Sequence, residues 1–211
     1  MDDLTYQAFL FNRLNKFDYQ PALTCVETNE TITYKELRDK VEAGASQLIG
    51  LGVPIGTHFA ILTPNSIEQV IYKLGVSCCG GTLIPLNDKL GVREVEYILR
   101  DAQPKVVIMA TQKHVAPVLD YLKEADENSI TVIGLPGFDI EYPEEFYSFG
   151  WNDIKENLEF PVASPDDIAT IAYTGGTTGT PKGVMHSQQG MRDSIITSCM
   201  EYPYDDQDRI L

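Results

Sequence analysis

Short apolar runs alternate with longer amphipathic segments along this chain, and this alternation limits the fold more than any other feature. Apolar runs of strand length occur at 58–62, 83–86, 105–110 and 130–133, with helical patterns between consecutive runs. Strands separated by helices at this spacing are typical of right-handed βαβ units. We therefore predict an α/β fold with a mostly parallel sheet and flanking helices.

Two capping patterns predict where helices begin. Thr33 and Glu36 have the spacing of a capping box, and Ser66 and Gln69 repeat it before the next amphipathic segment. The helices that follow should run to about residue 49 and toward residue 79. The remaining predicted elements are helices at Leu4–Asn15, Val92–Asp101 and Val115–Ala125, and a strand at Ala22–Val26.

Residues 134–165 interrupt the alternation with four prolines and several acidic side chains. We interpret this stretch as a long connection with one short helix near Trp151–Asn157. A linker between two domains is the competing interpretation, which length alone does not decide.

The segment Tyr173–Val184, which reads Y-T-G-G-T-T-G-T-P-K-G-V, concentrates glycine, threonine and one lysine. Glycine lets backbone N–H groups converge on one point, threonine hydroxyls add donors, and Lys182 adds a positive charge. Such a loop suits the phosphates of a nucleotide. Because the apolar run 168–172 precedes it and the strand-like Gly183–His186 follows, we expect the phosphates to bind on a loop between two strands.

The P-loop of the nucleoside triphosphatases is the main alternative, and the sequence argues against it. That motif, G-x-x-x-x-G-K-[ST], has glycine before the lysine and Ser or Thr after it. Here Pro181 precedes Lys182 and Gly183 follows. A flexible Gly/Thr linker is the other alternative, and the strand patterns on both sides make it a poor explanation.

The segment resembles the signature of the adenylate-forming superfamily, Y-T-S-G-T-T-G-x-P-K-G, at every fixed position except Gly175, where serine is usual. This superfamily includes acyl-CoA synthetases, luciferases and the adenylation domains of peptide synthetases. The resemblance covers about residues 21–211. Further stretches that match in the order of the superfamily are Gly52–Leu62, Pro64–Ser66, Gly80–Asn87, Glu96–Asp101 and Asp166–Ala169.

The resemblance implies a two-step reaction with ATP, Mg²⁺ and coenzyme A. A carboxylate attacks the α-phosphate of ATP to give an acyl-adenylate and pyrophosphate, and a thiol then displaces AMP. Lys182 would act electrostatically as the loop closes, and Thr174 would assist magnesium. The residues that the resemblance assigns to phosphate binding are Thr174, Gly175, Gly176, Thr177, Thr178, Gly179, Thr180 and Lys182.

The pair Leu86-Asn87 after Pro85 resembles acyl-CoA synthetases more than peptide-synthetase adenylation domains, which tend to carry aspartate there. We therefore expect a small-molecule acyl or aryl acid as substrate, with a role in fatty acid metabolism. An adenylation domain of the peptide-synthetase type stays open as the alternative.

Members of the superfamily are much longer than 211 residues, so the resemblance implies an N-terminal part of the AMP-binding domain. Residues 1–133 would form its βαβ region, 134–165 the connection, and 166–211 a truncated phosphate-loop region. We expect these residues alone to form no adenylate. A non-enzymatic interaction module, a homo-oligomer and pairing with a chain that supplies the remainder stay open.

The formal net charge of −15 opposes binding to nucleic acid and to anionic membranes. It also repels ATP, so a phosphate site must act locally. The sequence shows neither a signal peptide nor a membrane-spanning stretch, and we expect a cytoplasmic location. The four cysteines are too few and too irregular for a disulfide framework or a zinc site, and Cys78-Cys79 is expected to be buried and reduced.

The three histidines, His58, His114 and His186, show no metal-ligand spacing. His58 opens an apolar strand and is interpreted as a core or edge residue. His186 lies near the glycine-rich segment, where packing is the simpler explanation.

Overall fold

The computed structural model describes residues 4–14, 16–124, 130–135, 137–138, 140–143, 146, 159–175, 180–202, 205, 208 and 210. Within these ranges, six strands form one sheet in the order β6-β5-β3-β4-β7-β8. Neighbours from β6 to β7 are parallel, and β8 runs antiparallel to β7. The strands are β3 (His58–Thr63), β4 (Thr82–Asn87), β5 (Val106–Met109), β6 (Thr131–Gly134), β7 (Ile168–Thr174) and β8 (Lys182–Ser187). The predicted mostly parallel α/β fold is confirmed.

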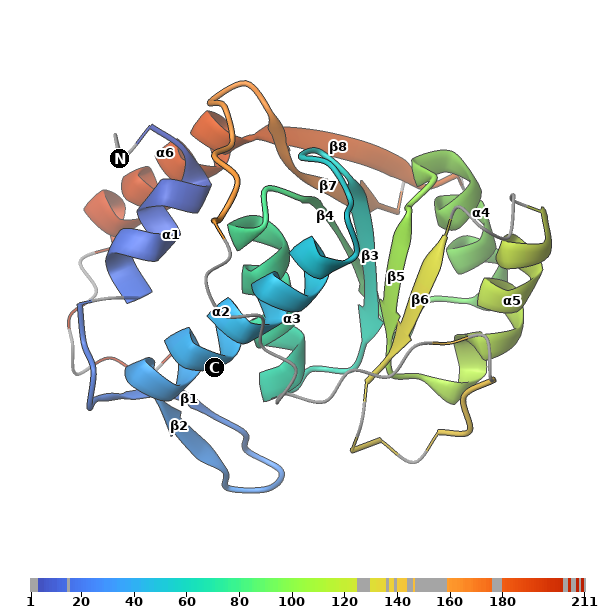
Figure 1. Ribbon diagram of the computed structural model, residues 1–211, viewed down its shortest axis with the longest axis horizontal. Helices are drawn as coiled ribbons and strands as arrows, with labels where there is room; N and C mark the ends of the chain where they lie inside the picture. The colour runs from blue at the N-terminus through green and yellow to red at the C-terminus, as the bar shows by residue number, and fades with distance from the viewer. Residues whose placement is uncertain are drawn as a thin grey trace.

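Helices cover both faces of this sheet (Figure 1). One face carries α1 (Tyr6–Leu14), α2 (Tyr34–Gly50), α3 (Ile67–Cys78) and α6 (Gln188–Glu201). The other face carries α4 (Val92–Ala102), the short 3₁₀ helix η1 (Gln112–His114) and α5 (Val115–Glu124). A separate antiparallel hairpin, β1 (Pro21–Thr24) with β2 (Thr31–Thr33), lies beside α2.

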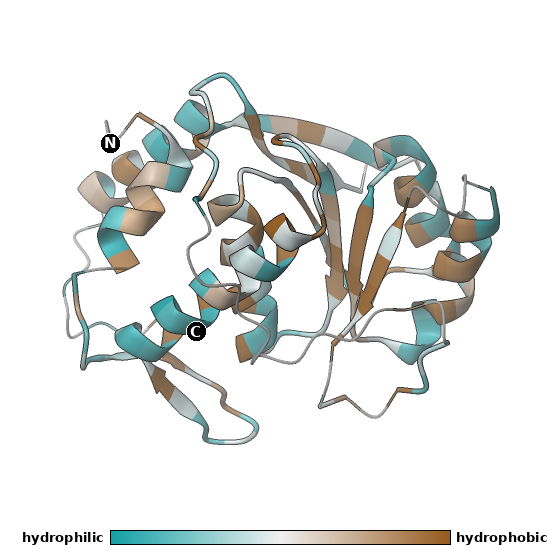
Figure 2. Ribbon diagram, in the orientation of Figure 1, coloured by the Kyte–Doolittle hydropathy of each residue, from teal (hydrophilic) through white to brown (hydrophobic). Residues whose placement is uncertain are grey.

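The central strands divide the core into two layers. Phe59 and Ile61 of β3 pack with α2 and α3, whereas the alternating Ala60 and Leu62 pack with α4 and α5. Both sets are buried because successive side chains of a strand point to opposite faces. Figure 2 shows the apolar residues along these strands, as expected for a parallel sheet covered on both sides.

The two predicted helix starts are confirmed by their capping bonds. The Thr33 hydroxyl accepts from the Glu36 N–H at 3.3 Å, and the Glu36 carboxylate accepts from the Thr33 N–H at 2.7 Å. The Ser66 hydroxyl accepts from the Gln69 N–H at 3.1 Å. The predicted helix near residues 151–157 lies outside the described residues.

Gln7 on α1 joins three distant segments of the chain. Its amide nitrogen donates to the carbonyls of Cys78, at 2.7 Å, and Pro161, at 2.8 Å, and its amide oxygen accepts from the Ala163 N–H at 2.9 Å. Cys78 ends α3, where carbonyl groups have no partner within the helix. The backbone N–H of Gln7 donates to Gln188 at the start of α6. This buried side chain therefore links α1, α3 and the end of the 134–165 connection.

The β7–β8 hairpin is packed most tightly where Gly183 lies opposite Tyr173. A Cβ atom at Gly183 would lie 2.8 Å from Cγ2 of Ile171 and 3.1 Å from Cζ of Tyr173. The Tyr173 hydroxyl donates to Oδ2 of Asp101, at the end of α4, at 2.5 Å. The glycine lets the tyrosine ring lie close to β8, and the aspartate fixes the far end of that ring.

Replacing Gln7 with leucine should destabilise the fold, because two carbonyl groups and one N–H would lose their partner. Each buried polar group without a partner costs about 1–3 kcal/mol, so we expect a loss on the order of 3 kcal/mol in the free energy of unfolding. Gln189→Leu is the control, since that side chain is exposed on α6 and should change stability by less than about 0.5 kcal/mol. Urea denaturation measures both, and equal effects would contradict the role given to Gln7.

Gly183→Ala should lower the free energy of unfolding by about 1–3 kcal/mol, the usual cost of overpacking. Gly175→Ala is the matched control at the other end of the same hairpin, where a Cβ atom would meet nothing within 4 Å. It should be neutral or slightly stabilising, because alanine restricts the unfolded chain. Thermal and urea denaturation of both variants test the pair, and a Gly175→Ala variant as unstable as Gly183→Ala would count against this packing.

Candidate functional site

The glycine- and threonine-rich segment connects the two strands of an antiparallel hairpin, β7 and β8. Thr174 ends β7 and Lys182 begins β8, and the two residues are partners across the hairpin. The connection between two strands that the sequence predicts is therefore present. Of the eight residues assigned to phosphate binding, Gly176, Thr177, Thr178 and Gly179 lie outside the described residues.

The described residues at the base of the turn leave polar groups open to solvent. Thr174, Gly175, Thr180 and Lys182 are all exposed. Within the described ranges, the Lys182 ammonium group has no ion-pair partner, so its charge is available to a bound anion. The backbone of Gly175 is open as well, because nothing lies within 4 Å of the position of a Cβ atom.

Serine would also fit at position 175. The φ angle of Gly175 lies outside the left-handed region, and the space around the missing Cβ is open. The chain therefore departs from the superfamily signature without a steric reason in the described structure. What glycine changes is chemical, since it exposes more backbone and lacks a hydroxyl donor.

The hairpin turn lies at the carboxyl edge of the parallel strands. Leu83 of β4 is opposite Thr170 of β7, and this register places Asn87 level with Thr174. Ligands of α/β proteins bind outside this edge of the sheet. The same edge holds a polar cavity of about 480 Å³ beside the ends of β3 and β4.

Two threonine hydroxyls hold the hairpin to the rest of the sheet. Thr82 donates to the carbonyl of Ile168 at 2.7 Å, and Thr170 donates to the carbonyl of Leu83 at 2.9 Å. These bonds support β7 where its described ladder with β4 consists of one residue pair. This role could not be predicted from the sequence, because threonine is common in strands whether or not its hydroxyl group bonds to a neighbouring strand.

The ionisable groups around the hairpin are positioned for packing. Burial, with a further contribution from the bond to Asp101, raises the pKa of Tyr173 above its ordinary value, so the hydroxyl stays protonated and donates. His58 begins the central strand β3, and its Nδ1 lies 2.7 Å from the carbonyl oxygen of Ala102, in agreement with the predicted packing role. His186 is exposed on β8 and lines an apolar cavity.

His114, Cys78 and Cys79 also have packing roles. His114 is buried, its Nε2 donates to the Leu90 carbonyl at 3.0 Å, and burial lowers its pKa. Cys78 and Cys79 are buried thiols, as predicted, and burial raises the pKa of each to about 12. In the part of the chain that the structure describes, no group of three or more His, Cys, Asp or Glu side chains could hold a metal ion.

None of the described helices is both long enough and apolar enough to cross a bilayer.

Two kinds of protein are among the relatives of this chain. The long-chain-fatty-acid–CoA ligase FadD13 of Mycobacterium tuberculosis is 29% identical over 191 residues, which cover 87% of this chain and 35% of the ligase. Tyrocidine synthase 3 of Brevibacillus parabrevis is 30% identical over 208 residues, which cover 98% of this chain and 3% of the synthase. The alignments therefore cover a small part of each relative.

Solved structures agree with the fold. ATP-bound MatB from Rhodopseudomonas palustris superimposes with a TM-score of 0.79 at 26% identity, over 99% of this chain and 39% of MatB. The anthranilate CoA ligase AuaEII, solved with anthranoyl-AMP, gives a TM-score of 0.71 over 92% of this chain and 36% of the ligase. Residues 10–211 match the family described as AMP-binding enzyme. The chain therefore belongs to the AMP-binding enzyme family.

Proposed function

We propose that the β7–β8 hairpin binds the β- and γ-phosphates of ATP during the activation of a carboxylic acid. The acid would form an acyl-adenylate and pyrophosphate, and coenzyme A would then take the acyl group as a thioester. The observation that carries this proposal is the hairpin itself, with Thr174 and Lys182 paired at the mouth of a glycine-rich turn. ATP in the solved structure of MatB supports it.

Three described residues at the turn have distinct tasks in this proposal. Lys182 neutralises negative charge on the departing pyrophosphate, which stabilises the transition state more than the ground state. Gly175 lets phosphate oxygens approach its backbone, because no side chain lies in the way. Thr174 offers a hydroxyl oxygen, a ligand type that Mg²⁺ accepts, and the ion would supply further charge neutralisation when bound.

We propose an acyl or aryl acid as the substrate. Asn87, which follows Leu86 at the carboxyl edge, supports this choice because peptide-synthetase adenylation domains tend to carry aspartate there. Its Oδ1 accepts from the Lys89 N–H at 2.9 Å, which orders the turn after β4. The relatives include a CoA ligase and tyrocidine synthase 3, so an amino acid is the alternative substrate. A pyrophosphate-release assay of a longer protein that contains these residues, with fatty, aryl and amino acids compared, distinguishes the two substrate classes.

An interaction module remains the second candidate function, and the position of β8 favours it. β8 is the edge strand of the described sheet, and its Val184 and Met185 side chains are 44% and 66% exposed. Exposed edges with apolar side chains invite pairing with another strand. Light scattering at increasing protein concentration separates a self-associating module from a monomer that binds nucleotide.

Lys182→Ala should weaken binding of Mg²⁺-ATP to the 211-residue chain by about tenfold or more, the loss expected for one charge-assisted contact. Lys123→Ala is the control, because it changes net charge equally but removes an exposed lysine that pairs with Asp120 on α5. Isothermal titration calorimetry measures both. If the two variants bind alike, the proposed role of Lys182 is wrong.

The 211-residue chain by itself should catalyse no carboxylate-dependent ATP–pyrophosphate exchange. Activation also needs groups that position the adenosine of ATP, and the hairpin residues supply none of these. In a longer protein that contains these residues and catalyses the exchange, Lys182→Ala should make the exchange slower. Clear exchange by the chain alone would overturn this expectation, whereas undiminished exchange by the variant would remove Lys182 from the mechanism.

A further inference from the structure

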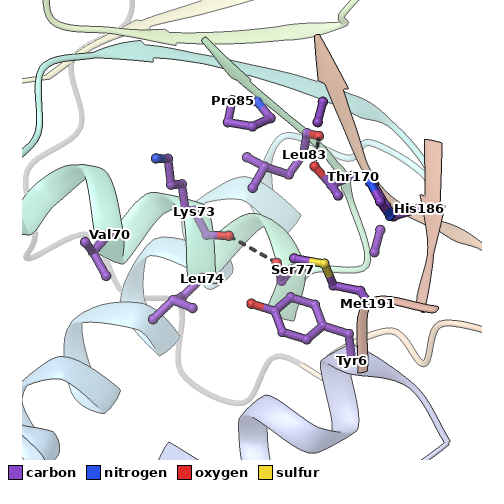
Figure 3. Close-up of a pocket in the computed structure, with 12 residues that line it drawn as sticks. Tyr6, Val70, Lys73, Leu74, Ser77, Leu83, Pro85, Thr170, His186 and Met191 are labelled. Atoms are coloured by element: carbon purple, nitrogen blue, oxygen red, sulfur yellow. Dashed lines mark hydrogen bonds between the residues drawn. The ribbon is translucent and has the colours of Figure 1, made fainter. Parts of the chain in front are cut away.

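An apolar cavity of about 430 Å³ lies between the helices α1, α3 and α6 and the strands β4, β7 and β8 (Figure 3). Val70 and Leu74 line it from α3, Leu83 from β4, Ala172 from β7 and Met191 from α6. Its volume falls within the range of about 300–1,000 Å³ that is typical of small-molecule sites. The cavity is therefore large enough and apolar enough for the body of a small organic molecule.

Lys73 places an amine in this apolar wall. Its side chain leaves α3 on the side of the cavity where Pro85 lies (Figure 3) and is half-buried. Within the described residues, its ammonium group has neither an ion-pair partner nor a hydrogen-bond partner. The hydroxyl of Ser77, one turn further along α3, donates instead to the backbone carbonyl of Lys73 at 3.2 Å (Figure 3). The amine therefore meets apolar surface without a counter-ion from the described part of the chain.

Burial makes this amine a better nucleophile than the amine of an exposed lysine. It lowers the pKa of Lys73, because the surroundings disfavour the charged form. At a given pH, more of the side chain is then the neutral amine, which alone has a free electron pair. Withdrawal of a lysine from water into an apolar pocket is a known way to activate it toward carbonyl compounds. Lys73 thus combines a reactive group with a cavity that can hold the rest of the reagent.

A second, polar cavity gives Lys73 access to solvent and shows which reagents suit the site. Lys73 and Pro85 line both cavities, which therefore meet at these two residues. Lys89 and Glu27, in the wall of the polar cavity, are exposed, and Asp88 completes its charged side chains. Two lysines and two acids balance, so these charges favour neither an anion nor a cation. A neutral reagent meets no electrostatic penalty on its way to Lys73.

We propose that Lys73 is a covalent binding site for a neutral aldehyde with an apolar body, which it holds as an imine. The body fills the space beside Leu74, Leu83 and Met191. The Lys73 nitrogen attacks the carbonyl carbon, and a proton moves from that nitrogen to the carbonyl oxygen. Loss of this oxygen as water then leaves a C=N bond. One amine and one aldehyde give one imine and one water, so the step needs neither an oxidant nor a reductant.

This site goes beyond the proposed function and uses different groups. A carboxylate forms no such bond with an amine, so the ligand differs in class from the acid that the hairpin would help to activate. Neither ATP nor Lys182 takes part in the step. Failure of one proposal therefore leaves the other intact.

The direct test is reductive alkylation of the 211-residue chain with octanal in the absence of nucleotide. Sodium cyanoborohydride, added as the trapping reagent, converts each imine to a stable amine, and peptide mass spectrometry locates the octyl groups. Lys123 on α5 is the internal reference, because it is exposed and pairs with Asp120. We expect Lys73 to be alkylated at least about tenfold faster, the gain that burial of part of the octyl chain gives. Equal rates at the two lysines would overturn the proposal.

Propanal is the matched probe, because it has the same carbonyl group and a much shorter apolar body. The preference for Lys73 over Lys123 should fall several-fold when propanal replaces octanal, since less apolar surface is buried. The same preference with both aldehydes would mean that the amine is reactive but the cavity binds nothing, which contradicts the proposal.

A substitution in the wall of the cavity tests the contribution of the apolar body. Ala172→Leu adds a larger side chain on β7 and should slow the alkylation of Lys73 by octanal several-fold. Alkylation by propanal, and alkylation of Lys123 by either aldehyde, should stay unchanged. A cooperative thermal transition establishes that the variant is folded. An unchanged octanal rate at Lys73 in the folded variant would count against the assigned cavity.

Thermal unfolding without the trapping reagent gives a readout that does not depend on the wall of the cavity. Octanal should raise the melting temperature of the unsubstituted chain, because a ligand that binds the folded state stabilises it. Lys73→Arg keeps the positive charge but forms no imine, so most of this shift should be lost. Lys123→Arg is the matched control and should keep the full shift. A shift of equal size in the two variants would show that Lys73 does not bind the aldehyde.

Discussion

The antiparallel pairing of β7 with β8 is the constraint on which the candidate site depends. Every earlier strand of the sheet runs in one direction, and the chain reverses its direction between Thr174 and Lys182, which are partners across the hairpin. The reversal therefore brings the Thr174 hydroxyl and the Lys182 ammonium group to the same end of the sheet. Gly175, which follows Thr174, has no side chain to cover its backbone. The antiparallel pairing thus brings together the described groups that can contact an anion.

A reversal at the edge of a sheet is useful for function only if it is held in place. Thr82 and Thr170 attach β7 to β4 through side-chain hydroxyls, and Tyr173 reaches Asp101 at the end of α4. Gly183 allows that reach, because a Cβ atom there would lie 2.8 Å from Cγ2 of Ile171 and 3.1 Å from Cζ of Tyr173. Tyr173 and Gly183, which are partners across the hairpin, thus support the connection between the two strands. Groups that are already held in place can stabilise a developing charge without having to reorganise during the reaction.

The chain's own charge makes local positioning more important. A net charge of −15 repels a polyanion at long range, and screening reduces this repulsion beyond about 10 Å. Attraction must then come from groups in direct contact, such as Lys182 and the backbone at Gly175. The polar cavity at the same edge follows the same logic, because its acidic and basic side chains balance.

The fold was largely predictable, because strand length, apolar periodicity and capping boxes are local signals. The four strands predicted from apolar runs agree with β3 to β6 to within one residue at each end. Helix α6 was not predicted, since Gly190 and a mixed polar sequence weaken its pattern, and only the Ser187 cap reveals its start. Contacts between distant residues, such as Tyr173 with Asp101, have no local signal at all.

The unusual position of Lys73 could have been found from the sequence. Val70, Lys73, Leu74 and Ser77 have the i, i+3, i+4, i+7 spacing of one helix face, so two polar residues, Lys73 and Ser77, interrupt the apolar residues on that face of α3. Such an interruption normally costs stability, as does the buried Thr63 hydroxyl, which has no partner among the described residues. Both departures lie at the carboxyl edge of the sheet, beside the polar cavity that Lys73 and Thr63 line. Local rules of packing are therefore broken at the edge where the candidate site lies, which is where functional constraints are expected to override them.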